Sequence, residues 1–275
     1  MPGRPEAGGS RALAWLYCPA AQRPILGALL GIEREIGASL RSGLDHTVAH
    51  ARLAWWREEC ARSSGGNPGH PLTRELVAHL GATSAAVLGR LTGLVDLAEW
   101  DLSRATFDSR LELAAYCERW GGAILEPLAL GTAAAAPVRA LAASVREIEL
   151  LVSLAAEAHA GRIRLPLAEL EPLAVSPGQL AQPPWPAALA ALLRERHRQL
   201  RAALAASVAA VPPAAQPSLR GAIVWAALSA QHSRRAAQRL PAASLTRDHP
   251  RALDGWRAWR IARLAQAGRG RLGAD

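Results

Sequence analysis

The sequence predicts an all-α protein, and three observations carry that prediction. Half of the residues are hydrophobic, and alanine and leucine, both good helix formers, are the most common among them. Apolar residues recur at helical spacing, as at Val145, Ile148 and Val152. Glycine and proline residues then separate the periodic segments, as Gly161 does at the end of this one. Helices joined by short irregular connections are therefore expected throughout.

Start and stop signals define the helices of the N-terminal half. Pro24 stands at the start of the first long helix and Gly43 at its end, the positions that each residue type prefers. The next helix is expected to begin after Asp45 as N-cap and to run to about Arg62. Residues 71–97 contain two further helices.

The C-terminal half continues in the same way. The helix that ends at Gly161 is followed by a Pro-rich connection over residues 171–186. A long helix is expected over residues 187–211 and another over 217–239. Last comes an amphipathic helix with Trp and Arg residues on different faces, which suits either an anionic membrane surface or packing of its tryptophans against the domain.

These elements predict one domain. At 275 residues the chain is long enough to bury a full core. We expect a flexible N-terminal lead-in over residues 1–23, a helical domain over 24–267 and a disordered tail over 268–275.

The charge of the chain narrows the classes of partner. Its formal net charge is +9, and all 32 basic residues are arginine. Such a balance suits a nucleic acid, an anionic membrane surface or diphosphates. Because no recognised nucleic-acid motif or basic stripe with interleaved aromatic residues is present, no nucleic-acid partner is expected.

Cysteine usage and hydropathy indicate the compartment. The three cysteines are widely spaced and form no CxxC pair, which is typical of a reducing compartment. The N-terminus lacks the apolar core of a signal peptide, and no apolar run reaches the roughly 18 residues of a membrane span. A cytoplasmic protein is expected, with peripheral contact at the inner face of the membrane as the alternative.

Four ordered motifs carry the chemistry of the chain. The segment after Ser144 reads SVREIELLVSLAAEAHAGRIRLPLAEL and places Ser153 one helical turn before Glu157. An earlier helix contains ARLAWWREEC and is followed by a His-Pro pair at residues 70–71. The segment LELAAYCERWGG lies between this helix and Ser144. The helix after Pro24 contains EREIGASLR.

These motifs resemble those of the squalene/phytoene synthase family over about residues 25–260. There the corresponding segments read roughly DxxxDxxxGRxYLP, RLxWWRxxL, ELxxYCxxVAG and CREIDDIVDE. The resemblance implies an all-α, isoprenoid-synthase-type helical bundle around a central cavity. It also implies a prenyl diphosphate or isoprenoid lipid as ligand, held through Mg²⁺ by aspartates.

The resemblance implies a set of site residues. Arg57 and Arg162 correspond to diphosphate contacts, although an Arg near a helix end also often pairs with a neighbouring carboxylate. Tyr116 and Gly121 correspond to the prenyl pocket, with close helix packing as the alternative for the glycine. The metal ligands would be Glu157 and, on the earlier helix, Glu35.

Most of the aspartates of the family motifs are missing. Ser153 stands at the first aspartate of the later motif, and Gly37, Ala38 and Arg41 stand where the earlier motif has aspartates. An Arg cannot ligate Mg²⁺, and its charge opposes the metal. We therefore expect no cofactor, with Mg²⁺ only if the chain is active.

Two functions remain open from the sequence. The first is a divergent family member without prenyl transferase activity that acts as a scaffold, assembly or isoprenoid-binding protein, similar to the branch that includes an assembly factor for respiratory complex I. A protein partner follows from that reading. The alternative is an Mg²⁺-dependent head-to-head transferase that condenses farnesyl or geranylgeranyl diphosphate.

A histidine pair gives only a weak indication of a metal site. His46 and His50 have the i, i+4 spacing of a metal-binding pair, but the sequence shows no third ligand. We interpret them as part of a solvated helix face.

Overall fold

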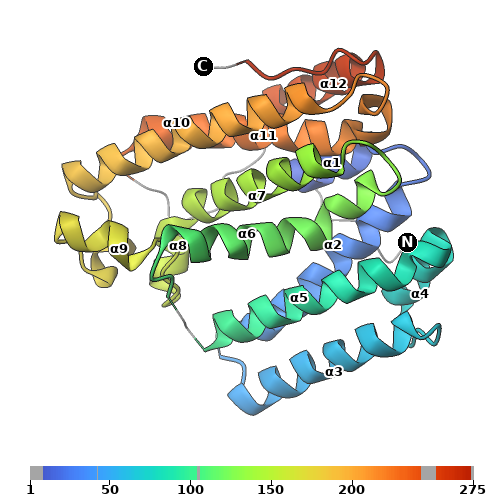
Figure 1. The fold of residues 1–275 in the computed structure, drawn as a ribbon. Helices are drawn as coiled ribbons and strands as arrows, with labels where there is room; N and C mark the ends of the chain where they lie inside the picture. The colour runs from blue at the N-terminus through green and yellow to red at the C-terminus, as the bar shows by residue number, and fades with distance from the viewer. Residues whose placement is uncertain (1–8, 42, 104–105, 243–251, 274–275) are drawn as a thin grey trace.

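The computed structural model describes residues 9–41, 43–103, 106–242 and 252–273. Every regular element within them is a helix, so the all-α prediction is confirmed (Figure 1). The N-terminal elements are α1 Ser10–Tyr17, α2 Arg23–Gly37, η1 Ala38–Leu40, α3 His46–Ser64, α4 Pro71–Leu80, η2 Gly81–Thr83 and α5 Ser84–Leu102. The central elements are α6 Arg110–Ile124, η3 Glu126–Ala129, α7 Ala135–Val152, α8 Leu154–His159, α9 Leu167–Leu170, η4 Glu171–Leu173 and η5 Pro177–Ala181. The C-terminal elements are α10 Ala187–Ala210, α11 Gln216–Arg239 and α12 Ala252–Gln266.

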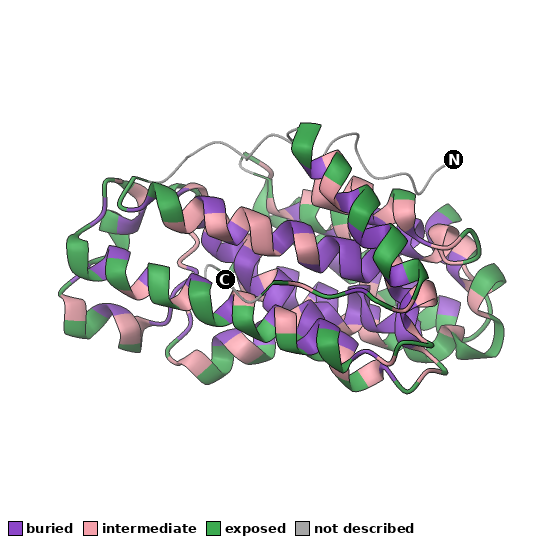
Figure 2. Cartoon of the chain, turned by 90° about the horizontal axis from the view of Figure 1, so that it is seen from above, coloured by how far each residue is buried: buried purple, intermediate pink, exposed green. Residues whose placement is uncertain are grey.

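The helices form a bundle with α6 and α7 at its centre. In Figure 1, α3, α4 and α5 lie on one side of this central pair, and α10, α11 and α12 lie on the other. Helix α7 packs against α6, α10 and α11, and α5 joins α3 to α6. Buried residues cover the inward sides of the helices and exposed residues the outward sides (Figure 2). The largest fully buried side chains include Trp225 of α11 and Phe107.

Several helix boundaries follow the signals in the sequence. The Asp45 carboxylate accepts hydrogen bonds from the backbone N–H groups of Thr47 (2.8 Å) and Val48 (3.2 Å), so its prediction as N-cap of α3 is confirmed. Gly161 has φ +81°, the left-handed conformation that glycine adopts without steric cost, directly after α8.

The predicted helix before Gly161 contains a break. Helix α7 ends at Val152, and α8 begins at Leu154. At the junction, the Ser153 hydroxyl donates a hydrogen bond to the backbone carbonyl of Glu149 (2.7 Å). The Glu149 carbonyl also accepts the backbone N–H of Ser153 (3.2 Å), so the hydroxyl and the N–H share one acceptor. Such back-bonding by a serine weakens and bends a helix at this point.

Part of the predicted N-terminal lead-in is helical and packed. Within residues 1–23, helix α1 lies against α11, with Ala14 and Cys18 fully buried. The approach is close because Gly221 of α11 has no side chain: a Cβ there would lie 2.5 Å from the Cys18 sulfur. Two elements distant in the sequence are thereby joined.

The described part of the predicted tail also contacts the domain. The backbone N–H of Gly270 donates to Oε1 of Gln216 (2.6 Å), and Nε2 of Gln216 donates to the Gly270 carbonyl (3.3 Å).

Among the helices of the described ranges, none combines the length and the apolar character that crossing a bilayer requires.

Candidate functional site

Glu157 on α8 is held by two arginines that follow it in the chain. Nε of Arg162 donates to its Oε2 (2.8 Å) and Nη2 of Arg162 to its Oε1 (3.2 Å), while Nε of Arg164 donates to Oε2 (3.0 Å). The turn at Gly161 brings both arginines back toward the helix. Both carboxylate oxygens of the predicted metal ligand thus accept hydrogen bonds from guanidinium groups.

Arg164 continues these contacts into the core. Its Nη1 donates to Oδ1 of Asp101 at 2.5 Å, and the two side chains are only 3% and 6% exposed. The Tyr116 hydroxyl donates to the other oxygen of Asp101 (3.1 Å). The Arg164 guanidinium also lies over the Tyr116 ring, 5.5 Å from its centroid. Tyr116, predicted to line a prenyl pocket, is therefore a hydrogen-bonding partner of a buried ion pair.

A second group of charged residues extends from Tyr116 toward α2. Nη2 of Arg146 donates to the Tyr116 hydroxyl, and Nη1 of Arg146 donates to Glu149 (both 3.3 Å). Glu149 also accepts from Arg11 of α1 (2.8 Å), and Arg11 pairs with Glu33 of α2 (2.6 Å). The hydrogen bonds thus connect α1, α2, α6 and α7.

We call this continuous set of contacts the charge string. Its members in order are Glu33, Arg11, Glu149, Arg146, Tyr116, Asp101, Arg164, Glu157 and Arg162. Carboxylates and guanidinium groups are equal in number along it, so its formal charges cancel. Such pairing is what allows several ionised groups to lie within the interior of a protein.

Aromatic rings flank the string. Nε1 of Trp120 donates to Glu33 (2.7 Å), and the Arg146 guanidinium lies 5.2 Å from the Trp120 ring centroid. Trp225 packs edge-on against Trp120, and Arg11 lies 5.3 Å from its centroid. These rings fix the arginines through packing and cation–π attraction as well as through charge.

The protonation states follow from these contacts. Burial alone would raise the pKa of Glu157, but the hydrogen bonds from Arg162 and the charges of Arg164 and Arg162 outweigh it and lower that pKa to about 2. For Glu149, burial is likewise outweighed by Arg11 and Arg146, so its pKa is lowered. Burial raises the pKa of the Tyr116 phenol despite the two nearby arginines, which keeps the hydroxyl protonated and able to donate to Asp101.

These side chains do not fit a magnesium site. Mg²⁺ requires near-octahedral oxygen ligands, and it would have to displace the guanidinium groups from Glu157 to reach its oxygens. The other ligand expected on this helix is replaced by Ser153, whose hydroxyl bonds to the backbone. Across the described residues, no cluster of three or more Asp, Glu, His or Cys side chains is arranged to hold a metal ion.

Two of the predicted site residues lie away from the string. Glu35 on α2 is 40% exposed and lies 3.9 Å from Arg52 and 4.0 Å from Arg34. Arg57 on α3 is also 40% exposed and pairs with Asp96 and Glu99 of α5, each at 2.8 Å. Neither residue contacts Glu157. The structure thus brings together Glu157, Arg162 and Tyr116 of the predicted set.

Gly121 lies at a close crossing of two helices. A Cβ on Gly121 of α6 would be 2.7 Å from the Cβ of Ala142 on α7. Helix α6 continues past the adjacent Gly122 to Ile124. The glycine therefore permits close packing of α6 on α7, which is the alternative that the sequence left open.

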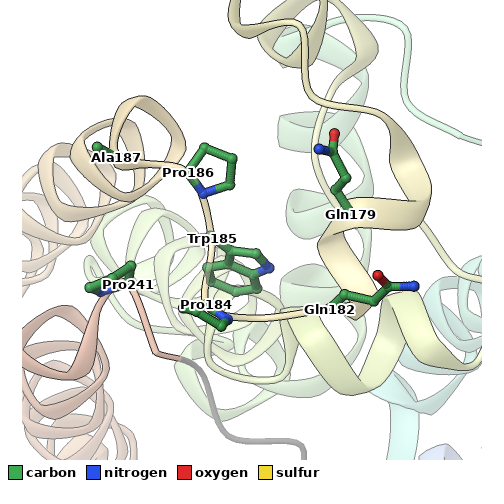
Figure 3. Close-up of a pocket in the computed structure, with 7 residues that line it drawn as sticks. All are labelled: Gln179, Gln182, Pro184, Trp185, Pro186, Ala187 and Pro241. Carbon is green, nitrogen blue, oxygen red and sulfur yellow. The ribbon is translucent and has the colours of Figure 1, made fainter.

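A pocket lies beside the Pro-rich connection (Figure 3). Trp185 stands at its centre, Gln179 and Gln182 border one side, and three proline rings and Ala187 complete the lining. None of these lining residues is charged. It therefore provides neither metal ligands nor a cation for a diphosphate.

Sequence reasoning missed several members of the string, namely Arg11, Glu33, Asp101, Arg146, Glu149 and Arg164. Glu149 precedes Ser153 by one helical turn, and this i, i+4 spacing places it on the same face as Glu157. The pairing of Arg11 with Glu149 spans 138 residues, and no local pattern signals it.

Glu59 is a further buried acid with a structural role. Its fully buried carboxylate accepts hydrogen bonds from the backbone N–H groups of Gly69 (2.9 Å) and His70 (2.8 Å) and from Thr73. Burial raises its pKa, but these hydrogen bonds and Arg62 outweigh that and lower it to about 2. Glu59 thus holds the loop between α3 and α4.

Comparison with known proteins is consistent with this architecture. A profile of squalene/phytoene synthases matches residues 5–257. The structure is similar to that of squalene synthase HpnC from Alicyclobacillus acidocaldarius, with TM-score 0.64 and 16% identity over 83% of this chain and 88% of that one. It is also similar to a dehydrosqualene synthase solved in complex with a ligand, with TM-score 0.67 and 17% identity over 94% and 90% of the two chains. A search of curated protein sequences finds no match.

Proposed function

Because the chain belongs to the squalene/phytoene synthase family and has its all-α isoprenoid synthase fold, we propose that it is a divergent member without prenyl transferase activity. It would act as a scaffold, assembly or isoprenoid-binding protein. The observation that supports this most directly is the pairing of both Glu157 oxygens with Arg162 and Arg164.

The physical argument concerns charge. Ionisation of an allylic diphosphate requires concentrated positive charge at the leaving group, which divalent cations held by carboxylates commonly provide. Here the carboxylates of the charge string are each neutralised by an arginine of the same chain. Binding a divalent cation at Glu157 would break its ion pairs with Arg162 and Arg164 and leave Arg164, 3% exposed, with only Asp101 as a partner.

The partner and the location form part of the same proposal. An isoprenoid lipid, a prenyl diphosphate or a protein would be bound without conversion, and the chain would be cytoplasmic with peripheral contact at the inner face of the membrane. Tyr116 and Gly121 remain the residues proposed for contact with an isoprenoid, and Arg57 and Arg162 remain those proposed for a diphosphate. Glu157 and Glu35 are the proposed ligands only in an active, Mg²⁺-dependent form.

The decisive test is turnover. Purified protein is incubated with Mg²⁺ and labelled farnesyl or geranylgeranyl diphosphate, with a parallel sample in EDTA, and the extracted products are separated by chromatography. We expect no C30 or C40 product. Equilibrium dialysis of the same labelled diphosphates measures binding separately from conversion.

The alternative is an active transferase, which predicts different products in the same assay. A C30 or C40 product that disappears in EDTA and in Glu157→Gln would contradict the proposal. Circular dichroism of that variant checks that it is folded. Glu195→Gln, which removes an exposed carboxylate paired with Arg198 on α10, is the matched control.

A further inference from the structure

Helix α12 exposes an unusual combination of side chains. Trp256 is 53% exposed, Trp259 49% and Leu253 63%, although large apolar residues generally lie inside. We call this surface the Trp–Arg face of α12; its members are Leu253, Trp256, Trp259, Arg260, Arg263 and Leu264. The sequence left open whether the tryptophans pack on the domain, and the structure shows them half-exposed to solvent.

The opposite side of α12 is firmly attached to the bundle. Ala258, Ile261 and Ala265 are buried, and α12 packs along α11. Asp254 at the start of the helix forms a buried ion pair with Arg235 of α11 (3.1 Å). The helix therefore has a fixed orientation, and the Trp–Arg face is directed away from the core.

The sequence predicted Trp and Arg residues on different faces of this helix, but in the structure two of the arginines lie over the tryptophans. The Arg260 guanidinium is 5.0 Å from the Trp256 ring centroid, and that of Arg263 is 5.9 Å from the Trp259 centroid. Within the described residues, neither Arg260 nor Arg263 forms an ion pair with the chain itself. Their charges are available to an anionic partner.

The charge on this surface has one sign. The exposed positions of α12 include no acidic residue, because Asp254 is buried against Arg235. The exposed residues Arg269 and Arg271 continue the positive charge beyond the helix. The surface thus combines half-exposed indole rings with unneutralised positive charge.

We propose that the Trp–Arg face of α12 docks the protein on the surface of an anionic lipid bilayer. Indole rings favour the headgroup region because they join an apolar body to a polar N–H group, and arginines beside them attract anionic headgroups. A helix attached to the domain by its small residues and carrying aromatic and basic side chains outside suits contact parallel to the membrane plane. Because Trp and Arg are also enriched at protein interfaces, a second copy of the chain is the competing occupant, and the experiment below separates the two.

Vesicle sedimentation tests the proposal. The full chain is mixed with vesicles of phosphatidylcholine alone or with added phosphatidylserine. Binding is expected only to the anionic vesicles, and it should weaken as salt increases because headgroup attraction is screened. Trp256→Ala/Trp259→Ala is expected to lower the partition coefficient roughly tenfold, and Arg260→Gln/Arg263→Gln roughly thirtyfold.

Matched controls lie outside the Trp–Arg face. Trp55 of α3 is 42% exposed, and Figure 1 places α3 at the opposite side of the bundle from α12. Trp55→Ala therefore removes one indole of similar exposure elsewhere. Arg34→Gln/Arg52→Gln changes the net charge by the same amount at exposed sites on α2 and α3. Neither control should change vesicle binding by more than about twofold.

Three outcomes would overturn the proposal. The first is absence of binding to anionic vesicles by the folded full chain. The second is equal loss of binding in the α12 variants and in their controls. The third is a dimer, detected by analytical ultracentrifugation without vesicle binding, that Trp256→Ala/Trp259→Ala dissociates; that result would identify a second copy of the chain as the occupant. The face does not include Glu157 or its arginines, so this test is independent of the turnover assay.

Discussion

At the scale of single residues, the centre of the protein depends on how each acid is paired. Asp101 and Asp96 both belong to α5 and both bind an arginine, yet their surroundings differ. The Asp101–Arg164 pair is almost fully buried, whereas Asp96 and Arg57 are 42% and 40% exposed. A buried charge that loses its partner cannot be solvated, but an exposed one can.

This difference gives a prediction for two matched substitutions. Asp101→Asn is expected to lower the free energy of unfolding by about 3 kcal/mol, because it leaves Arg164 with only Glu157 in a buried site. Asp96→Asn should cost less than about 1 kcal/mol. Urea denaturation followed by circular dichroism measures both. Equal losses would show that burial of the Asp101 pair is not what makes it important.

At the scale of helices, α6 and α7 approach each other through two small residues. Gly121 faces Ala142 with room for no additional carbon, whereas a Cβ on the adjacent Gly122 would meet only Oε2 of Glu126, at 3.5 Å. Replacing a helical glycine with alanine normally stabilises a helix by about 1 kcal/mol. The two glycines therefore separate helix propensity from packing.

We expect Gly122→Ala to raise the free energy of unfolding by up to about 1 kcal/mol. Gly121→Ala should instead lower it by about 1 to 2 kcal/mol, since overpacking outweighs the gain in propensity. Adding Ala142→Gly to Gly121→Ala relieves the contact, so the double-mutant cycle should show favourable coupling. Thermal and urea unfolding give these values. Stabilisation by Gly121→Ala would indicate free space beside it, as a pocket-lining role requires.

Local signals account for most of the elements and for few of the long-range pairings. Capping by Asp45 and the helix stop at Gly161 depend only on nearby residues, so the sequence predicted them correctly. The break at Ser153 was missed, because a serine is compatible with a helix until its hydroxyl bonds to the preceding turn. The Arg164–Asp101 contact joins positions 63 apart, and only the packing of α5 beside the turn after α8 brings them together.

At the scale of the whole molecule, buried ionisable groups make stability depend on pH. His197 of α10 is 2% exposed, and its Nδ1 lies 3.0 Å from the Ser233 hydroxyl of α11. Burial, and to a lesser extent the charge of Arg201, lowers the pKa of His197 to about 4. The unfolded chain, in which the pKa is about 6.5, takes up a proton first as the pH falls.

Burial raises the pKa of Glu147 to about 7, so the contribution of Glu147 to the free energy of unfolding grows as the pH falls from about 7 to about 4.5 and opposes that of His197. The contribution of His197 itself, on the order of 3 kcal/mol, should be lost as the pH decreases from about 6.5 to about 4. Above pH 6.5 this contribution is fully present, because the imidazole is neutral in both states. Glu157 adds a second decline below about pH 4.5, since its pKa is lowered to about 2 in the folded protein. Urea denaturation at a series of pH values measures both declines.

Two variants test whether His197 causes the loss of stability between about pH 6.5 and about 4. His197→Gln keeps a polar group opposite Ser233 but cannot take up a proton, so the difference in stability between wild type and this variant should shrink as the pH falls from 6.5 to 4. His79→Gln removes an exposed histidine of α4 and serves as the control. If His197→Gln retains the full pH dependence of the wild type, the decline arises from carboxylates, and the junction of α10 and α11 does not carry it.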